Sequence, residues 1–255
     1  MINSAKNPII AEVIALQKKK STRNEKGLFV VEGLRAVKEV CEDDVRYFIA
    51  TNNICKADFT TNTQWIEVSD EVFKTISDTK TPQGILAVVQ QKNFTLQNLT
   101  QAQNSFYLVL ENIQDPGNLG TVIRTAYSFG VDAIFITKGS ADIYSPKVVR
   151  STMGALWNTK IISNLEISEI FDWLNQHNIS TYATDLTNSN PIYDVDFTEK
   201  VALIIGNEAN GISQETRDLA TFKVKIPMVG GESLNASIAT GICLYEIMKQ
   251  RAKIL

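Results

Sequence analysis

The chemically most informative residue is an arginine within a predicted helix. The stretch from Leu110 to Gly130 reads LENIQDPGNLGTVIRTAYSFG, which indicates a loop followed by a helix. Arg124 falls outside the apolar stripe of that helix, together with Gly120 and Tyr127. The guanidinium is therefore presented on the side that the sheet does not cover, beside a glycine that allows close approach. From this stretch alone, an ordinary solvent-exposed arginine is an equally acceptable interpretation.

Residues that usually carry proton transfer or bind metals are scarce. The only histidine, His177, lies at the end of a predicted helix, where a surface residue is expected. The three cysteines, Cys41, Cys55 and Cys243, are far apart and include no CxxC pair, which argues against a zinc site or a disulfide framework. We therefore expect reduced thiols, no metal, and a reaction whose proton chemistry is not built on histidine.

The arginine helix has clear start and stop signals. Phe106–Leu110 is a short apolar run of strand type, and residues 115–118 (DPGN) are turn chemistry. We expect Asn118 to cap the helix and Gly130 to end it in a left-handed conformation. One face should pack on a sheet and carries Leu119, Val122, Ala126 and Phe129.

From Ser105 onward the pattern alternates between strand and helix, which is typical of a mostly parallel sheet covered by helices. The predicted strands are Phe106–Leu110, Ala133–Thr137, Lys160–Ile162, Ser180–Thr184, Val201–Ile205 and Phe222–Ile226. Helices are predicted between them, notably at Pro146–Gly154 and Ser168–Gln176, and a last helix at Asn235 to about Lys253.

The first part of the chain reads as a separate, smaller α/β domain over residues 1–91. Its predicted helices are a segment after Pro8, Arg35–Cys41 and Glu71–Ile76, and its predicted strands are Gly27–Gly33, Tyr47–Thr51, Trp65–Val68 and Gly84–Val89. Residues 92–104 (KNFTLQNLTQAQN) are polar and rich in Gln and Asn, so we predict a linker there and a second domain over residues 105–255.

Composition restricts the class of protein. A chain of 255 residues with a net charge of −3 is too acidic to coat nucleic acid non-specifically, so any RNA contact must use a local basic patch. No apolar run is long enough to span a membrane, and the N-terminus lacks a signal-peptide core, so we expect a cytoplasmic protein. The chain carries neither GxGxxG nor GxxxxGK[ST], the common phosphate-binding loops.

Two later stretches change the interpretation of Arg124. They are VALIIGNEANGIS at residues 201–213 and KIPMVGGESLNA at residues 225–236. With the first stretch they resemble the three motifs of the SpoU/TrmH branch of the SPOUT RNA methyltransferases, in the same order. The matching residues are Asn112, Asn118, Gly120, Arg124 and Ala126 in the first motif, Gly206, Asn207, Glu208 and Gly211 in the second, and Ile226, Pro227, Met228, Ser233, Leu234 and Asn235 in the third.

The resemblance implies a fold, a cofactor and a partner. It implies a C-terminal α/β domain with a deep trefoil knot, preceded by a substrate-binding domain with a fold like ribosomal protein L30e. It also implies S-adenosyl-L-methionine as the cofactor, a homodimer, and methylation of a ribose 2′-hydroxyl in RNA. Ribosomal RNA is the expected substrate and transfer RNA the alternative. The rivals from other classes are a catalytically silent RNA-binding protein on the same scaffold and a metabolic α/β enzyme.

The resemblance also assigns roles to residues. The catalytic set is Arg124, Asn118, Glu208, Ser233 and Asn235, and the cofactor-binding set is Gly206, Asn207, Gly211, Ile226, Met228 and Leu234. Because a guanidinium stays charged in proteins, we expect Arg124 to bind a phosphate and stabilise alkoxide charge rather than act as a base. Helix capping is the structural alternative for Asn118, Ser233 and Asn235, an ordinary turn for Gly211, and a surface carboxylate for Glu208.

The densest basic stretch lies in the first domain. Contact with RNA phosphates is expected for Lys18, Lys19, Lys20, Arg23, Lys26 and Arg35. A solvated helix end is the alternative interpretation of this cluster. The sequence names neither the RNA nor the nucleotide that is methylated, and it leaves the proton acceptor open.

Overall fold

The computed structural model describes residues 1–59, 63–231 and 233–252. Glu232, in the predicted loop of the third motif, and Lys253, the predicted end of the last helix, lie outside the described residues. The chain forms two compact units, Met1–Lys92 with Asp142–Trp157, and Asn93–Ala141 with Asn158–Leu255.

The first unit is built on a four-stranded sheet in the order β1-β4-β2-β3. β4 pairs antiparallel with β1 and β2, and β3 pairs parallel with β2. Apolar residues of α1 (Ile10, Val13, Leu16) and α4 (Val72, Phe73, Ile76) pack against it. The strands are β1 (Leu28–Glu32), β2 (Val45–Ala50), β3 (Trp65–Glu67) and β4 (Ile85–Gln90), and the helices are α1 (Pro8–Lys18), α2 (Lys20–Lys26), α3 (Leu34–Glu39) and α4 (Asp70–Ile76).

A segment from the middle of the chain completes the first unit. It contains α6 (Pro146–Thr152) and α7 (Ala155–Asn158), whereas a single helix was predicted at residues 146–154. Met153 and Gly154 interrupt it because both adopt positive φ angles, 48° and 90°. Arg150 pairs with Asp78, which ties α6 to the remainder of this unit.

The second unit is built on a seven-stranded sheet in the order β7-β6-β5-β10-β8-β11-β9. All strand pairings in its described residues are parallel, as expected for a sheet whose strands alternate with helices. The strands are β5 (Phe106–Leu110), β6 (Ala133–Thr137), β7 (Ile161–Leu165), β8 (Ser180–Thr184), β9 (Asn190–Pro191), β10 (Val201–Ile205) and β11 (Phe222–Lys225).

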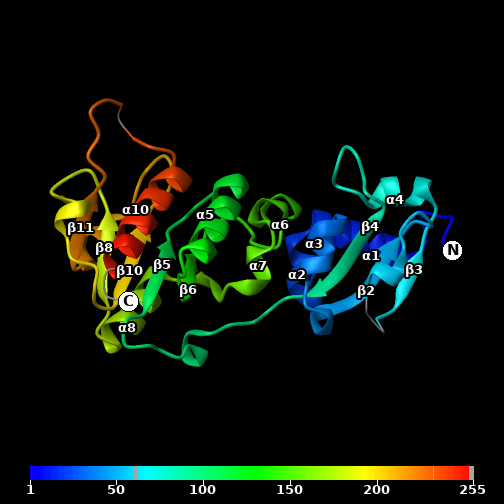
Figure 1. The fold of residues 1–255 in the computed structure, drawn as a ribbon, viewed down its shortest axis with the longest axis horizontal. Coiled ribbons are helices and arrows are strands. Elements are labelled where there is room, and N and C mark those ends of the chain that lie inside the picture. The colour runs from blue at the N-terminus through cyan, green and yellow to red at the C-terminus, as the bar shows by residue number, and fades with distance from the viewer. Residues whose placement is uncertain (60–62, 232, 253–255) are drawn as a thin grey trace. The chain divides into compact units, whose positions relative to one another are not determined.

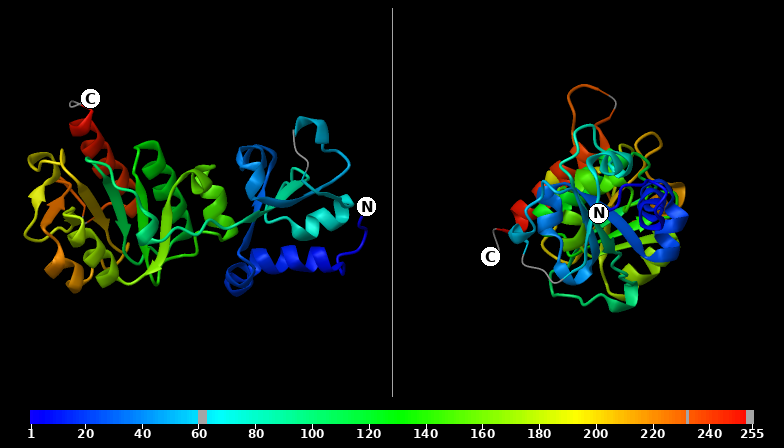
Figure 2. Two further views of the ribbon diagram at one scale, coloured as in Figure 1. Left: turned by 90° about the horizontal axis from the view of Figure 1, so that it is seen from below. Right: turned by 90° about the vertical axis from the view of Figure 1, so that its right-hand side faces the viewer.

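Helices cover both faces of this sheet (Figures 1 and 2). α5 (Pro116–Ser128) and α10 (Ala236–Arg251) lie side by side on one face. α8 (Ile167–Gln176) packs its apolar stripe on the other face, against Tyr107 and Phe135. The short helix α9 (Gln214–Leu219) follows the loop after β10.

The predicted linker is not a free connection in this structure. Phe94, Leu96 and Leu99 pack against the core of the second unit, which the polar composition of residues 92–104 did not indicate. The domain limits at residues 91 and 105 stay a prediction.

Candidate active site

Three side chains from the three sequence motifs form one hydrogen-bonded row. Asn235 Nδ2 donates to Asn118 Oδ1 over 3.0 Å, and Asn118 Nδ2 donates to Glu208 Oε1 over 3.0 Å. Parallel strands place the loops after β5 and β10 at the same edge of the sheet, because these two strands are neighbours. The strand order therefore brings together residues that lie up to 117 positions apart.

The direction of this row is set by a helix cap. Asn235 is the N-cap of α10, and its Oδ1 accepts from the backbone N–H groups of Ser237 (2.9 Å) and Ile238 (3.4 Å). Because this oxygen already accepts two hydrogen bonds, the amide nitrogen of Asn235 is the group that donates to the oxygen of Asn118. The nitrogen of Asn118 then faces Glu208. Asn235 therefore has two roles: it caps α10 and it orients Asn118.

The expectation that Asn118 caps its helix is wrong. α5 begins at Pro116, and its N-cap is Asp115, whose side chain accepts from the N–H of Asn118 over 2.8 Å. Proline is favoured at the first helical position because its missing N–H has no helical partner there. The earlier start leaves the Asn118 side chain available for Glu208. Gly130 follows the helix with φ 71°, as predicted.

Glu208 is held as a carboxylate at the start of α5. Its oxygens also accept from the backbone N–H groups of Gln114 (3.4 Å) and Asp115 (3.3 Å). Partial burial raises the pKa of Glu208, whereas the Asn118 amide and these backbone donors lower it, and the net pKa lies below the ordinary value. Glu208 is therefore ionised at neutral pH.

Arg124 lies apart from this row. Arg124 is exposed on α5, on the side covered neither by the sheet nor by α10, as expected from the helical pattern. Gly120, predicted to share this exposed side, is instead buried. No described residue of the second unit receives a hydrogen bond or ion pair from the Arg124 guanidinium.

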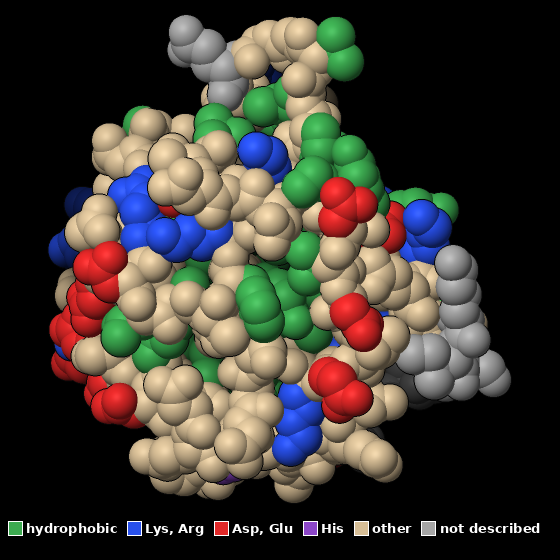
Figure 3. Space-filling view, turned by 90° about the vertical axis from the view of Figure 1, so that its left-hand side faces the viewer, with side chains coloured by type: hydrophobic (Ala, Val, Ile, Leu, Met, Phe, Trp, Pro, Cys, Tyr) green, Lys and Arg blue, Asp and Glu red, His purple; other side chains and the backbone are tan. Residues whose placement is uncertain are grey.

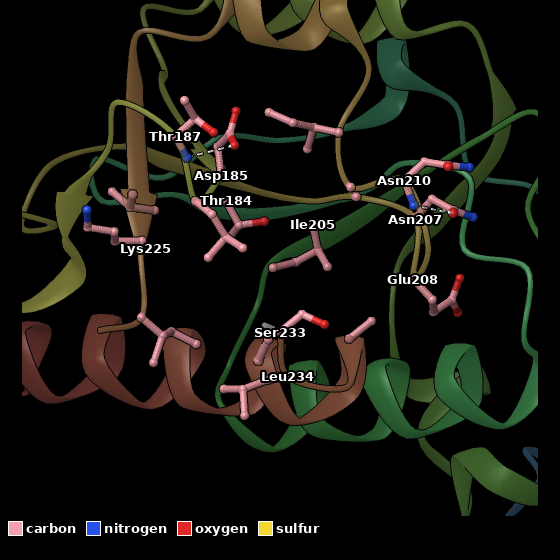
Figure 4. A pocket seen from close by; sticks show the side chains of 18 of the residues that line it. Thr184, Asp185, Thr187, Ile205, Asn207, Glu208, Asn210, Lys225, Ser233 and Leu234 are labelled. Atoms are coloured by element: carbon pink, nitrogen blue, oxygen red, sulfur yellow. Dashed lines mark hydrogen bonds between the residues drawn. The ribbon is translucent and has the colours of Figure 1, made fainter. Parts of the chain in front are cut away.

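A cavity of about 390 Å³ opens beside Glu208 (Figure 4). All six residues predicted to bind a cofactor line it: Gly206, Asn207, Gly211, Ile226, Met228 and Leu234. Glu208 and Ser233 from the predicted catalytic set line it too, whereas Asn118, Arg124 and Asn235 do not. Figure 4 shows Ser233 and Leu234 facing Ile205 across the cavity, above the start of α10.

The two glycines of the second motif also have a role within their own loop. A Cβ on Gly206 would overlap the backbone of Gly211 and Ile212, so Gly206 permits the loop to close on itself. Asn207 and Gly211 exchange two backbone hydrogen bonds of 2.9 Å across this closure. Gly211 has φ 68°, which is the ordinary turn role considered as the alternative.

Asn207 has an internal role besides lining the cavity. It is buried, its Oδ1 accepts from the N–H groups of Ala209 and Asn210, and its Nδ2 donates to the carbonyl of Asn112 over 2.8 Å. Asn112 has φ 55°, a conformation that asparagine tolerates better than most residues. Asn207 therefore shapes the loop and ties the second motif to the first.

Further cavity residues were missed by sequence reasoning. Thr184, Asp185 and Thr187 line the cavity from the end of β8, and Arg217 lines it from α9. The available signal was the position of Thr184 and Asp185 at the end of the predicted strand Ser180–Thr184, where α/β folds bind ligands.

The predicted RNA-binding cluster divides in the structure. The prediction that Arg23 contacts RNA phosphate is wrong, because its side chain is only 5% exposed. The Arg23 guanidinium pairs with Asp142 and donates to the carbonyls of Leu16 and Gln17. Lys26 pairs with Glu12 at 2.7 Å, and Arg35 pairs with Glu39 at 3.2 Å. All members except Arg23 are exposed, including Lys18 at the end of α1, Lys19 between the helices, and Lys20 at the start of α2.

Comparison with known families and structures identifies the fold. Residues 105–245 match the model of the SpoU rRNA methylase family, and residues 7–87 match an MRM3-like substrate-binding domain. The chain belongs to the SpoU rRNA methylase family. This SpoU-family chain is 30% identical over 250 residues to the Bacillus subtilis protein RlmP, named 23S rRNA (guanosine(2553)-2′-O)-methyltransferase, covering 96% of this chain and 98% of that protein.

Solved structures of SpoU methyltransferases share the whole architecture. AviRb from Streptomyces viridochromogenes, solved in complex with AdoMet, aligns with a TM-score of 0.90 at 27% identity over 97% of this chain and 99% of that chain. An AdoMet-bound rRNA methyltransferase from Sinorhizobium meliloti aligns with a TM-score of 0.88 at 28% identity, covering 100% and 98%. The family and the mostly parallel α/β fold expected from the three motifs are confirmed.

Neither a candidate membrane-spanning helix nor a candidate metal-binding cluster occurs among the described residues. None of the helices there is both long and apolar enough to cross a membrane. No group of three or more His, Cys, Asp or Glu side chains is arranged to hold a metal ion in that part of the chain.

Proposed function

We propose that this protein transfers a methyl group from S-adenosyl-L-methionine to a ribose 2′-hydroxyl of 23S ribosomal RNA. The observation that carries the proposal is the row Asn235–Asn118–Glu208, which joins the three family motifs beside a ligand-sized cavity. Membership in the SpoU rRNA methylase family and the named activity of RlmP support the same reaction and substrate.

The cavity suits this cofactor. S-adenosylmethionine carries no phosphate, so its pocket needs apolar walls and hydrogen-bonding edges rather than a phosphate loop. Ile205, Ile226, Met228, Leu234 and Ala236 supply apolar wall. Polar groups at the edge come from Thr184, Asn210 and Ser233. We propose that Gly206, Asn207 and Gly211 act by fixing the loop that forms one wall.

We propose a role for each residue of the predicted catalytic set from its position in the structure. The bound cofactor supplies an activated methyl group. Glu208 lines the cavity and accepts from the amide of Asn118 beside it, so we propose that this carboxylate binds and orients a ribose hydroxyl and that Asn118 holds it in place. Ser233 adds a hydroxyl on the same cavity. Asn235 orients Asn118, and Arg124 binds the RNA phosphate and stabilises negative charge on the attacking oxygen.

We propose that the protein works as a homodimer. Ile238, Ile242 and Tyr245 recur at helical spacing on α10 and are 56%, 40% and 54% exposed. We call these three residues the α10 stripe. An exposed apolar stripe of this kind is typical of a protein–protein interface. Arg124 lies on the neighbouring helix α5. We propose that, when a second copy packs on the α10 stripe, Arg124 of one copy approaches the cavity of the other.

We further propose that the first unit holds the RNA and that the protein acts in the cytoplasm. The match of residues 7–87 to a substrate-binding domain supports the first point. Figure 3 shows basic and acidic side chains interspersed over one face of the molecule. Because the net charge of the chain is −3, we propose that RNA binding uses local contacts such as Lys18–Lys20. The trefoil knot implied by the family remains part of the proposal.

The test is methyl transfer from labelled S-adenosylmethionine to purified RNA. Protein, cofactor and either 23S ribosomal RNA or bulk transfer RNA are incubated, and ribose methylation is mapped. We expect label at a ribose of 23S ribosomal RNA. Label only in transfer RNA would replace the substrate, and cofactor binding without label in either RNA would favour the silent RNA-binding alternative.

A further inference from the structure

The cofactor cavity contains an ion pair that the mechanism above does not use. Asp185 Oδ2 lies 2.8 Å from Arg217 Nε, and the side chain of Asp185 is 8% exposed. Asp185 directly follows β8, and Arg217 lies on α9. Both residues line the cavity, so a buried carboxylate and a guanidinium meet at its wall.

The surroundings keep Asp185 charged and in place. Its Oδ1 accepts from the N–H of Thr187 over 3.1 Å, and its own N–H donates to the carbonyl of Val224 on β11 over 3.0 Å. Burial raises the pKa of Asp185, whereas the Thr187 N–H and Arg217 lower it, and the net pKa lies below the ordinary value. The carboxylate is thus a fixed charge to which the side chain of Arg217 is attached.

Arg217 lies near the loop that forms the cavity wall. The position that a Cβ would take on Gly211 is 3.8 Å from Nη2 of Arg217, and Gly211 exchanges two backbone hydrogen bonds with Asn207. α9 is also attached through its N-cap Ser213, whose N–H donates to the Glu111 carboxylate. Arg217 therefore stands between the end of β8, where it pairs with Asp185, and the loop that carries Glu208.

We infer that Asp185 and Arg217 are positioning residues for the cofactor: their ion pair holds α9 and residues 206–211 in the geometry that binds S-adenosylmethionine. The inference rests on the proposed function. Figure 4 shows Asp185 and Glu208 on different sides of the cavity, so the pair shapes the part remote from the ribose-binding row. Loss of the pair affects cofactor affinity and leaves RNA affinity intact.

The test measures binding rather than turnover. Calorimetry with S-adenosylhomocysteine, and a filter assay with a 23S ribosomal RNA fragment, are run on wild type, Asp185→Asn, Arg217→Gln and the double variant. We expect each single change to weaken S-adenosylhomocysteine binding at least tenfold, the double change to add little, and RNA affinity to stay within twofold. Arg217→Lys, which keeps the charge, should recover part of the affinity.

The matched control is Lys138→Gln, which removes an exposed ion pair with Glu166 in the same unit away from the cavity. It should bind both ligands like wild type. Wild-type-like cofactor affinity in folded Asp185→Asn and Arg217→Gln would overturn the inference, as would a parallel loss of RNA affinity, which indicates general unfolding. Failure of the wild type to bind S-adenosylhomocysteine would overturn the proposed function, and the inference with it.

Discussion

The amide of Asn118 donates a 3.0 Å hydrogen bond to the carboxylate of Glu208, although the two residues lie 90 positions apart. The bond joins the first turn of α5 to the loop after β10. It helps to lower the pKa of Glu208, and it joins Asn118, which does not line the cavity, to a carboxylate that does.

Asn118→Ala should slow methyl transfer by about 10- to 100-fold while cofactor affinity stays near normal. A hydrogen bond to a charged group contributes roughly 1.5–3 kcal/mol, and about 1.4 kcal/mol corresponds to tenfold in rate. Single-turnover kinetics would measure the effect. The control is Thr121→Ala on the same helix, whose hydroxyl bonds only the Gly117 carbonyl among the described residues.

The same substitution should raise the pKa of Glu208, because it removes a donor that favours the charged form. In the wild type the folded-state pKa is depressed, so the stabilisation from Glu208 is complete above its unfolded pKa and is lost as the pH falls through the folded value. NMR titration of labelled glutamate would check this. An unchanged Glu208 pKa in Asn118→Ala would show that Asn118 does not influence the ionisation of Glu208.

Arg124→Ala should abolish methyl transfer and leave S-adenosylmethionine affinity intact, because Arg124 does not line the cavity. Arg124→Lys keeps the charge but loses the planar fork, so partial activity is expected. Rate and calorimetric binding are measured on the same preparations. Near-normal turnover of Arg124→Ala would exclude Arg124 from the reaction.

Gly206→Val should lose cofactor binding through distortion of the loop. Its side chain would overlap the backbone of Gly211 and Ile212, which cannot move without opening the closure. Gly230→Ala is the control, because a Cβ there meets no atom within 4 Å. Calorimetry distinguishes the two variants, and unchanged binding by a folded Gly206→Val protein would contradict the assigned role of the loop.

Ile242→Glu should shift the protein toward the monomer. Burying one isoleucine side chain contributes about 1.5–3 kcal/mol, so the dimer dissociation constant should rise roughly 10- to 100-fold. Light scattering over a dilution series measures it. Tyr193→Glu, at a 59% exposed residue outside the α10 stripe, should leave the mass unchanged. A monomeric wild type would defeat the dimer proposal.

Replacing Lys18, Lys19 and Lys20 with Gln should lower the slope of log affinity against log salt by about two, because each phosphate contact contributes roughly 0.7–0.9. Replacement of Lys6, Lys74 and Lys80 makes the same charge change elsewhere in the first unit and should have little effect. An equal slope in both triple variants would show that the cluster is only a solvated helix end.

Arg23→Gln should instead lower the melting temperature, because Asp142 would lose its buried partner.

The sequence alone determined the elements and the family. Period-two and apolar runs predicted β5, β6, β8 and β10 with their observed bounds, because such patterns depend on neighbours along the chain. The order of three short motifs was enough to indicate the SpoU family, and all six predicted cofactor residues line one cavity.

Only the tertiary structure decided which of these residues meet. Composition could not show that Arg23 forms a buried ion pair with Asp142, or that residues 142–157 belong to the first unit. It could not show that Gly206 serves loop closure, or that Asp185 and Arg217 form a pair at the cavity. These facts depend on contacts between distant positions, which strand order and packing create and which local patterns of hydrophobicity and turn residues do not record.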